Sequence, residues 1–191
     1  MTKKRSLNRD KVLQTAVDIV RNDGLKALTL QRLAHDLNIR TQSLYNYISN
    51  LDELIALIGA HLINQLRQKI IDGIVGLSGK EALIRFADIA REFLIAEGSL
   101  AMIIFHLHEA PKDSEFNNAA LQLVALLNQV IDSSHIEVHD DAPYSHALIG
   151  SVLGFVFIET SQFYKDETYG SATKSYHQMI ERIITPSKSL A

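Results

Sequence analysis

The chain has 191 residues, of which 47% are hydrophobic and 21% are charged. This composition is ordinary for a globular protein of one or two domains and does not fit a disordered chain. Because the chain has no cysteine, disulfides, thiolate nucleophiles, zinc ribbons and iron–sulfur clusters are excluded.

The formal net charge of −3 is unevenly distributed along the sequence. Residues 1–50 contain nine cations and four anions, which gives +5, whereas residues 51–191 contain ten cations and eighteen anions, which gives −8. A basic N-terminal segment followed by an acidic remainder indicates that only the N-terminal segment meets a polyanion.

No segment is predicted to cross a membrane or to act as a signal peptide. The longest apolar run, residues 147–158, is well short of the ~18–20 residues that span a bilayer. The basic N-terminus is not followed by the apolar stretch that a signal peptide requires. We therefore expect a cytoplasmic protein.

The chain is predicted to be all-α, because apolar residues recur at helical spacing and no stretch alternates with a period of two. Asn8 is the candidate N-cap of a first helix that ends at Gly24. Thr29 is the candidate N-cap of a second helix over residues 30–37. A short third helix is expected at 41–47, and a fourth begins near residue 52 and ends between residues 72 and 79. Further helices are expected at 80–96, 99–109, 114–132, 143–164 and 171–184. A polar loop is expected at 133–143.

The second and third helices are joined by a tight turn at Asn38, which is the spacing of a helix-turn-helix. Leu44 and Ile48 should face inward, leaving a polar outer face on a helix short enough to enter a DNA major groove about 12 Å wide. Gln and Asn can pair with adenine, Arg with guanine or a phosphate, and a hydroxyl at a helix N-terminus with a phosphate. The candidate DNA contacts on this ground are Thr29, Arg40, Gln42, Ser43, Asn46 and Tyr47. The alternative is a helical corner without a DNA role, in which Asn46 is only a solvated surface residue.

A longer ordered pattern runs through the same segment: Leu28-Thr29-Leu30, Leu33-Ala34 and Leu44-Tyr45-Asn46-Tyr47-Ile48, followed by Asp52-Glu53-Leu54. This pattern, over residues 8–58, resembles the DNA-binding domain of TetR-family transcriptional regulators. The resemblance implies an all-α homodimer with a helix-turn-helix DNA-binding domain at residues 1–50 and an effector-binding and dimerisation domain at 51–191. It also implies that Tyr45 contacts the DNA backbone and Tyr47 a base, although Tyr45 could instead cover the edge of the core.

The sequence departs from the family pattern at three positions. Arg40 stands where the family usually has Ser or Thr, which moves the expected helix cap, and a further candidate DNA contact, to Thr41. Leu51 stands where a Lys often contacts phosphate, so that contact is left open. Ile48 replaces a frequent Phe but still fills an apolar position.

The segment 146–158 is apolar on nearly all sides, which is typical of a helix buried between two layers. Small residues along it would let another helix approach closely. We favour a dimer interface over a core helix of a single chain. The candidate interface residues are His146, Gly150, Ser151, Gly154 and Ile158.

A small-molecule effector, largely apolar, is expected to bind between the middle helices, in a pocket with few polar groups. The candidate lining residues are Phe86, Phe93, Met102, Phe105, His106, Phe116, Leu123 and Phe157, with Glu109 and Gln122 as further polar groups. The alternative is that these residues form ordinary core.

We therefore expect a ligand-responsive repressor that binds a palindromic operator as a homodimer and is released by its effector, with the helix at 52–70 as the lever. The alternatives are a helical binding module for protein partners and an enzyme or metal protein centred on histidines. His106 and His108 are two residues apart and face away from each other on a helix, and His135 and His139 lie in a predicted loop. No catalytic motif is present, and neither an enzyme activity nor a cofactor is expected.

Overall fold

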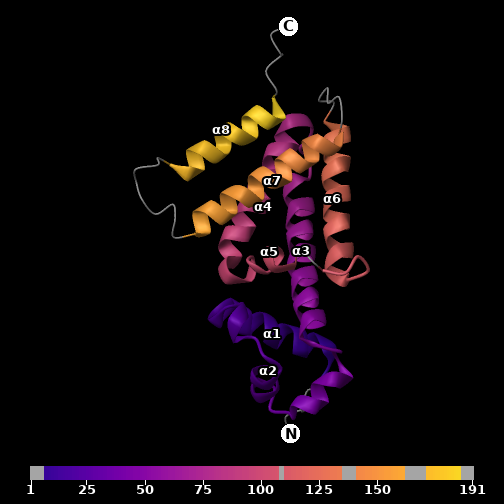
Figure 1. Ribbon diagram of the computed structural model, residues 1–191. Coiled ribbons are helices and arrows are strands. Elements are labelled where there is room, and N and C mark those ends of the chain that lie inside the picture. Colours follow the sequence, from indigo (N-terminus) through magenta and orange to yellow (C-terminus); the bar gives the residue numbers. More distant parts are fainter. Residues whose placement is uncertain (1–6, 108–109, 135–140, 162–170, 186–191) are drawn as a thin grey trace. The chain divides into compact units, whose positions relative to one another are not determined.

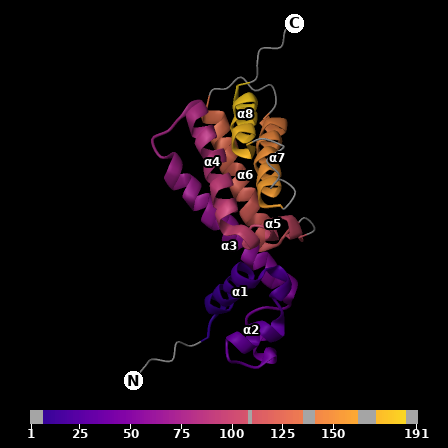
Figure 2. The ribbon, with the colours of Figure 1, turned by 90° about the vertical axis from the view of Figure 1, so that its left-hand side faces the viewer.

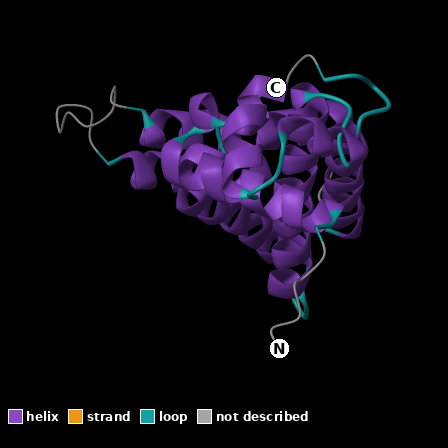
Figure 3. Ribbon diagram, turned by 90° about the horizontal axis from the view of Figure 1, so that it is seen from below, coloured by secondary structure: helices purple, strands orange, loops and turns teal. Residues whose placement is uncertain are grey.

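The computed structural model describes residues 7–107, 110–134, 141–161 and 171–185. Within these ranges all regular structure is helical and no strand is drawn (Figure 3), which confirms the predicted all-α class. No helix of the described ranges is both long enough and apolar enough to cross a membrane.

The chain forms two compact units. Unit 1 comprises Met1–Ile63 and Glu97–Ala120, and unit 2 comprises Asn64–Ala96 and Leu121–Ala191. Both units are therefore built from two separate stretches of sequence. The functional division predicted between residues 50 and 51 stays a prediction, and it differs from this division into compact units.

The helices follow one another along the chain as labelled in Figure 1. Unit 1 contains α1 (Arg9–Asp23), η1 (Leu25–Ala27), α2 (Leu30–Asp36), η2 (Thr41–Asn46), the beginning of α3 (Leu51–Ile74), the last residue of α4 (Gly79–Glu97), η3 (Gly98–Leu100), α5 (Ile103–His106) and the beginning of α6 (Glu115–Ser133). Unit 2 contains the rest of α3, α4 and α6 together with α7 (Asp141–Thr160) and α8 (Ala172–Ile184).

Side-chain caps define the beginnings of several helices, because they satisfy backbone N–H groups that have no partner inside the helix. The Asn8 side chain accepts a hydrogen bond from the Lys11 backbone N–H at 2.9 Å. The Thr29 hydroxyl accepts one from the Arg32 N–H at 3.1 Å. Both helix starts predicted from the sequence are therefore confirmed, and each cap contributes about 1 kcal/mol.

The structure differs from the predicted helices at three places. The expected third helix is a 3-10 helix, η2, and the expected helix at 99–109 is divided into η3 and α5. Helix α7 begins at Asp141, two residues before the predicted end of the polar loop. Pro143 lies in its first turn, as expected from the sequence, because that turn does not need the N–H that proline lacks. The predicted end of this helix, near residue 164, lies outside the described residues.

The core of unit 1 joins the helix-turn-helix elements to the beginning of α3. Leu33, Leu44 and Leu54 are fully buried, and Ile48 is 3% exposed, so the two inward positions predicted for the third helix are confirmed. In α3, a Cβ added to Gly59 would overlap the side chains of Leu107 and Phe116. Glycine there lets the segment after α5 and the beginning of α6 pack directly on α3.

Unit 2 is joined internally by an arginine on α4 whose side chain is largely shielded from solvent. The Arg91 guanidinium donates hydrogen bonds to both carboxylate oxygens of Glu159 on α7, at 2.7 and 3.1 Å, and to the Thr173 hydroxyl on α8 at 3.1 Å. It also lies 4.7 Å from the ring centroid of Tyr176, which is fully buried. α7 and α8, which lie side by side in Figures 1 and 2, are thus both fastened to α4.

The Arg91–Glu159 pair should contribute strongly to stability because each side chain is only 12% exposed. Replacing one partner leaves a buried charge without compensation, so Glu159→Gln should lower the free energy of unfolding by about 3–5 kcal/mol. The matched control is Glu92→Gln, which breaks the Arg85–Glu92 pair, whose side chains are 44% and 61% exposed, and should cost at most about 1 kcal/mol. Urea denaturation followed by circular dichroism measures both, and equal losses would contradict the assignment.

Candidate nucleic-acid interface

A tight turn connects α2 to η2. Asn38 adopts a left-handed backbone conformation with φ of 54°, which asparagine tolerates better than most residues. The Asn38 N–H donates to the His35 carbonyl and the Ile39 N–H to the Ala34 carbonyl, each at 2.9 Å. These bonds close the end of α2 and turn the chain directly into η2, as the helix-turn-helix prediction requires.

The candidate DNA contacts all lie in unit 1, between the N-cap of α2 and the C-cap of η2. Five of them are exposed, namely Thr29, Arg40, Gln42, Tyr45 and Asn46, and three are half-buried, namely Thr41, Ser43 and Tyr47. The outer face of η2 is thus largely polar and accessible, while Leu44 anchors its inner face. Contact of these eight residues with DNA remains a prediction.

The 3-10 geometry of η2 aligns residues that are three positions apart. A 3-10 helix has three residues per turn, so residues three apart align. Gln42 and Tyr45, which is 55% exposed, therefore share one face of η2. Ser43 and Asn46 share the next. In an α-helix residues three apart are also neighbours, but they are offset around the helix axis rather than aligned.

The cap expected at Thr41 is not found. Thr41 is the first residue of η2, and the N-cap is Arg40, which makes no side-chain capping bond. The physical reason is that the first turn closes on the Arg40 carbonyl, which accepts from the Ser43 N–H at 2.9 Å. The departure from the family pattern at Arg40 therefore leaves η2 without a hydroxyl cap.

Tyr47 makes a contact that the sequence did not indicate. Its hydroxyl donates a hydrogen bond to the backbone carbonyl of Leu7 at 3.2 Å. Tyr47 is the C-cap of η2, and Leu7 directly precedes the N-cap of α1. Since the two residues are forty positions apart, no local sequence pattern could have revealed this bond.

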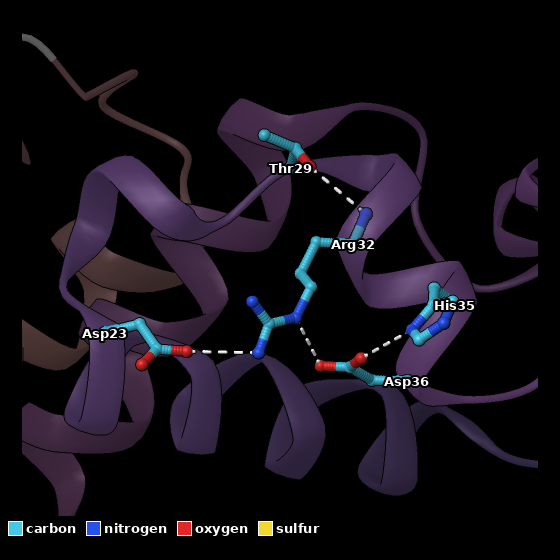
Figure 4. A network of polar contacts seen from close by, with 5 residues as sticks. All are labelled: Asp23, Thr29, Arg32, His35 and Asp36. Carbon is cyan, nitrogen blue, oxygen red and sulfur yellow. Dashed lines mark hydrogen bonds and ion pairs between the residues drawn. The ribbon is translucent and has the colours of Figure 1, made fainter.

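A polar network fastens α2 to the end of α1 (Figure 4). Arg32 on α2 donates to Asp36 at 2.8 Å and to Asp23 on α1 at 3.1 Å, and His35 lies 3.0 Å from the other oxygen of Asp36. The hydrogen bonds from His35 and Arg32 hold the pKa of the Asp36 carboxyl below its ordinary value. Together with the Thr29 cap, drawn in the same view, the network positions α2 and hence the turn into η2.

The beginning of α3 carries a second set of charge-assisted bonds. The Glu53 carboxylate accepts from the Ser49 N–H at 2.6 Å, which lowers the pKa of Glu53, and the Asn50 side chain accepts from the Glu53 N–H at 2.7 Å. Arg9 on α1 bridges Glu53 and Glu115, at 3.2 and 3.0 Å. One arginine thus joins the first turns of α1, α3 and α6.

Unit 1 does not carry the excess of positive charge that residues 1–50 have in the sequence. Unit 1 includes residues beyond position 50, and its sequence contains ten cations and ten anions, so its formal net charge is zero rather than +5. Arg9, Arg21 and Arg32 each pair with carboxylates inside the unit, Arg21 with Glu97 at 2.8 Å. Any attraction for a polyanion must therefore come from the distribution of the remaining cations and not from an excess of positive charge.

The candidate effector residues are divided between the two units. Phe86, Phe93, Leu123 and Phe157 belong to unit 2, and Met102, Phe105, His106 and Phe116 belong to unit 1. Phe86 and Phe93 are buried, Phe105, Phe116 and Leu123 are half-buried, and Met102, His106 and Phe157 are exposed. Their role in binding an effector stays a prediction.

A cleft of about 680 Å³ lies within unit 1, and His106 lines it. Its other walls come from the beginning of α3 and from residues 110–115, and they include the carboxylates of Asp52, Glu53, Asp113 and Glu115. The same lining also contains apolar residues, among them Ile55, Leu57 and Leu107, and of the candidate effector residues it contains His106 alone.

The candidate dimer residues lie along α7, where the two glycines face open space. His146, Gly150 and Gly154 are exposed, and Ser151 and Ile158 are half-buried. In the described structure no neighbouring element lies within 4 Å of where a Cβ would sit on Gly150 or Gly154. Packing among the described residues therefore does not account for these two glycines, and the interface remains a prediction.

No group of three or more histidine, aspartate or glutamate side chains among the described residues could hold a metal ion. Of the two histidine clusters considered from the sequence, His106 is described. His108, Glu109, His135, His139 and Asp140 lie outside the described residues.

No protein-family model and no curated protein matches the chain, but solved structures do. BioQ from Mycobacterium smegmatis has a TM-score of 0.70 and 20% identity, over 93% of this chain and 96% of that one. A possible TetR family transcriptional regulator from Streptomyces coelicolor A3(2) has a TM-score of 0.72 and 18% identity, over 93% and 97%. BioQ solved with its natural double-stranded DNA operator has a TM-score of 0.68 and 18% identity, over 94% and 99%.

These structures are similar to the chain over nearly the full length of both chains. Because the sequence identities are only 18–20%, the similarity establishes the fold alone. The resemblance first noted over residues 8–58 thus extends to the fold of the chain as a whole. The chain has the fold of the TetR-family transcriptional regulators.

Proposed function

We propose that this chain is a DNA-binding transcriptional regulator that reads its operator with η2. The observation that carries the proposal is the geometry of unit 1. A closed turn at Asn38 presents a short helix whose inner residue, Leu44, is fully buried and whose outer side chains are polar and exposed. Such an element fits the major groove, and a structure of similar fold, BioQ, was solved with its DNA operator.

The candidate side chains in and around η2 divide into two chemical roles. Gln42 and Asn46 carry amides that can pair with both polar atoms of an adenine edge. Arg40 can pair with guanine or bind a phosphate, and Thr29, Thr41, Ser43 and Tyr45 offer hydroxyls to the backbone. A surface with both kinds of group suits sequence-specific binding of double-stranded DNA.

We propose further that the protein acts as a homodimer on a palindromic operator. One η2 reads only one half-site, and a two-fold dimer would place two of them about one helical turn apart, or a multiple of it. The proposed interface is the face of α7 that carries Gly150 and Gly154, because an exposed stripe without side chains allows close approach of a second helix. Bound to an operator that overlaps a promoter, such a dimer would repress transcription.

We also propose that a small, largely apolar effector controls DNA binding. The support is the set of aromatic and aliphatic candidate side chains on α4, α6 and α7 of unit 2, together with the family resemblance. These side chains are Phe86, Phe93, Leu123 and Phe157. By linkage, an effector that favours a form with poor DNA affinity is itself bound more weakly when DNA is present. The effector would thereby release the repressor from its operator.

The DNA-binding proposal predicts a defined loss for Gln42→Ala. Selection of bound sequences from random duplex DNA should return an inverted repeat. On that duplex, Gln42→Ala should weaken binding about 5- to 150-fold for each half-site, which corresponds to about 1–3 kcal/mol for each lost base contact. It should also relax the preference at one base pair of each half-site.

The matched control for this measurement is Gln178→Ala, which truncates an exposed glutamine on α8 of unit 2 and should leave affinity unchanged. Gel-shift titration with both variants, after circular dichroism has verified their fold, decides the question. Unchanged affinity for Gln42→Ala would contradict the proposed reading by η2.

The dimer proposal predicts that Gly154→Arg separates the subunits without unfolding them. The open space around the Gly154 Cβ position admits the side chain in one subunit, whereas a helix packed against the stripe does not. Sedimentation should show the unchanged chain as a dimer and Gly154→Arg as a monomer with reduced operator affinity. Gln68→Arg, at an exposed position on α3, is the control and should remain dimeric.

The effector proposal predicts reciprocal coupling. A compound from an apolar library that raises the melting temperature should weaken operator binding by the same factor by which operator DNA weakens binding of the compound. Phe157→Ala, at an exposed position of unit 2, should reduce the affinity for the compound and leave operator affinity in its absence unchanged. A compound that binds without affecting DNA affinity would count against an effector role.

A further inference from the structure

The cleft of unit 1 is large enough for a small organic molecule and has an apolar floor. Its volume of about 680 Å³ lies within the range of about 300–1,000 Å³ that is typical of ligand sites. Ile55, Ala56 and Leu57 on α3 line it together with Leu107, and each of these residues is at most 9% exposed. Their side chains offer a surface on which the hydrocarbon part of a ligand can be removed from water.

The rim of the same cleft carries negative charge. Asp52, Glu53, Asp113 and Glu115 line it with a formal charge of −4, and the described lining contains no lysine or arginine. Asp52 and Asp113 are exposed, and their side chains make no hydrogen bond or ion pair within the described structure. The cleft therefore combines an apolar floor with two carboxylates that have no partner.

Two positive contributions from unit 1 offset part of this charge. Arg9 pairs with Glu53 and Glu115 and returns one positive charge. The helices α3 and α6 begin at the cleft, with acidic residues in the first turn of each, and a helix N-terminus acts as about +0.5 of a charge. About two negative charges are then left without compensation, so the cleft favours a cation over a neutral molecule or an anion.

The arrangement of the carboxylates does not suit a single metal ion. Four carboxylates and His106 line the cleft, yet within the described ranges no three such side chains are grouped closely enough to hold a metal. A ligand that meets both the charged rim and the apolar floor therefore needs a body of several atoms in addition to its positive charge.

We propose that the cleft of unit 1 binds an amphipathic organic cation. Its ammonium or guanidinium group lies at the rim, where Asp52 and Asp113 have no partner, and its hydrocarbon body lies on Ile55, Leu57 and Leu107. This site is separate from the effector pocket proposed in unit 2. Its occupation does not depend on DNA binding.

The geometry also makes the ligand a competitor of Arg9. The side chains of Arg9, Glu53 and Glu115 are 34–56% exposed, and exposed ion pairs of this kind contribute little to stability. A cation in the cleft can therefore replace the guanidinium at one or both glutamates at small cost. Removal of the Arg9 charge should accordingly strengthen binding of the ligand.

The first test compares hexylammonium, hexanol and hexanoate, which share one hydrocarbon body, in saturation-transfer NMR titrations of the full chain. Each exposed carboxylate can add up to about fivefold in affinity for a cation, so hexylammonium should bind about 5- to 25-fold more tightly than hexanol, and hexanoate more weakly than either. Equal affinity for hexylammonium and hexanol would overturn the proposal. Displacement of hexylammonium by magnesium chloride beyond that by sodium chloride of equal ionic strength would overturn it in favour of a metal site.

The second test locates the site with two double variants of equal charge. Asp52→Asn with Asp113→Asn removes the two carboxylates without a partner and should weaken hexylammonium binding about 5- to 25-fold. The control is Asp72→Asn with Asp132→Asn, at exposed positions of α3 and α6 in unit 2, and it should change the affinity less than twofold. Equal losses in both double variants, or no loss in either, would overturn the assignment to the cleft.

The third test measures the competition with Arg9. Arg9→Gln should strengthen hexylammonium binding about 2- to 5-fold, because it frees Glu53 and Glu115. Lys11→Gln is the control, since Lys11 is exposed on the same helix and its side chain forms no ion pair with a described residue. Equal effects of the two substitutions would overturn the competition, because they would reflect net charge alone. Melting temperatures establish that every variant is folded.

These outcomes are independent of the proposed function. A pocket in unit 2 that binds the same hydrocarbon body would accept hexanol as well as hexylammonium, and the substitutions at Asp52 and Asp113 would not affect it. Failure of the chain to bind any DNA duplex would overturn the proposed regulator and leave the affinities for hexylammonium as the measure of this site.

Discussion

The left-handed turn at Asn38 is the constraint on which the candidate interface depends. It ends α2 after seven residues and starts η2 within four more, so the two elements cannot separate without breaking the hydrogen bonds that close the turn. Leu33 and Leu44, both fully buried, then hold the inner faces of α2 and η2 in the same core. The accessible side chains of η2 are consequently displayed on a rigid support, which binding with defined geometry requires.

Three arginines of unit 1 hold its helices together through ion pairs. Arg9, Arg21 and Arg32 join α1 to α3, α6, the end of α4 and α2 through carboxylates. Exposed pairs of this kind are worth only about 0–1 kcal/mol each, so their main effect is to fix the register of α1 on its neighbours. The same pairs reduce the local excess of positive charge, which makes the placement of the remaining cations decisive for the binding of a polyanion.

Local structure was predictable where one residue determines it. Asn8 and Thr29 cap helices because their side chains reach the third N–H beyond them, and Leu44 and Ile48 are buried because of their spacing. The 3-10 form of η2 and the division between η3 and α5 were not predictable, since few local interactions separate these forms from α-helix. Contacts such as Arg9 with Glu115, which are 106 positions apart, arise only from the tertiary fold and leave no pattern in the sequence.

The division into compact units changes the expected route of a signal. The sequence suggested one joint, with the helix that begins near Asp52 as the lever. In the structure Glu97–Ala120 belongs to the same unit as the helix-turn-helix, and this segment pairs with both ends of α1 through Glu97 and Glu115. The chain therefore passes between the units three times, within α3, near the end of α4 and within α6. Under the proposed function, an effector bound to unit 2 would have three covalent connections through which to bias unit 1, and two of them enter the segment that is ion-paired with α1.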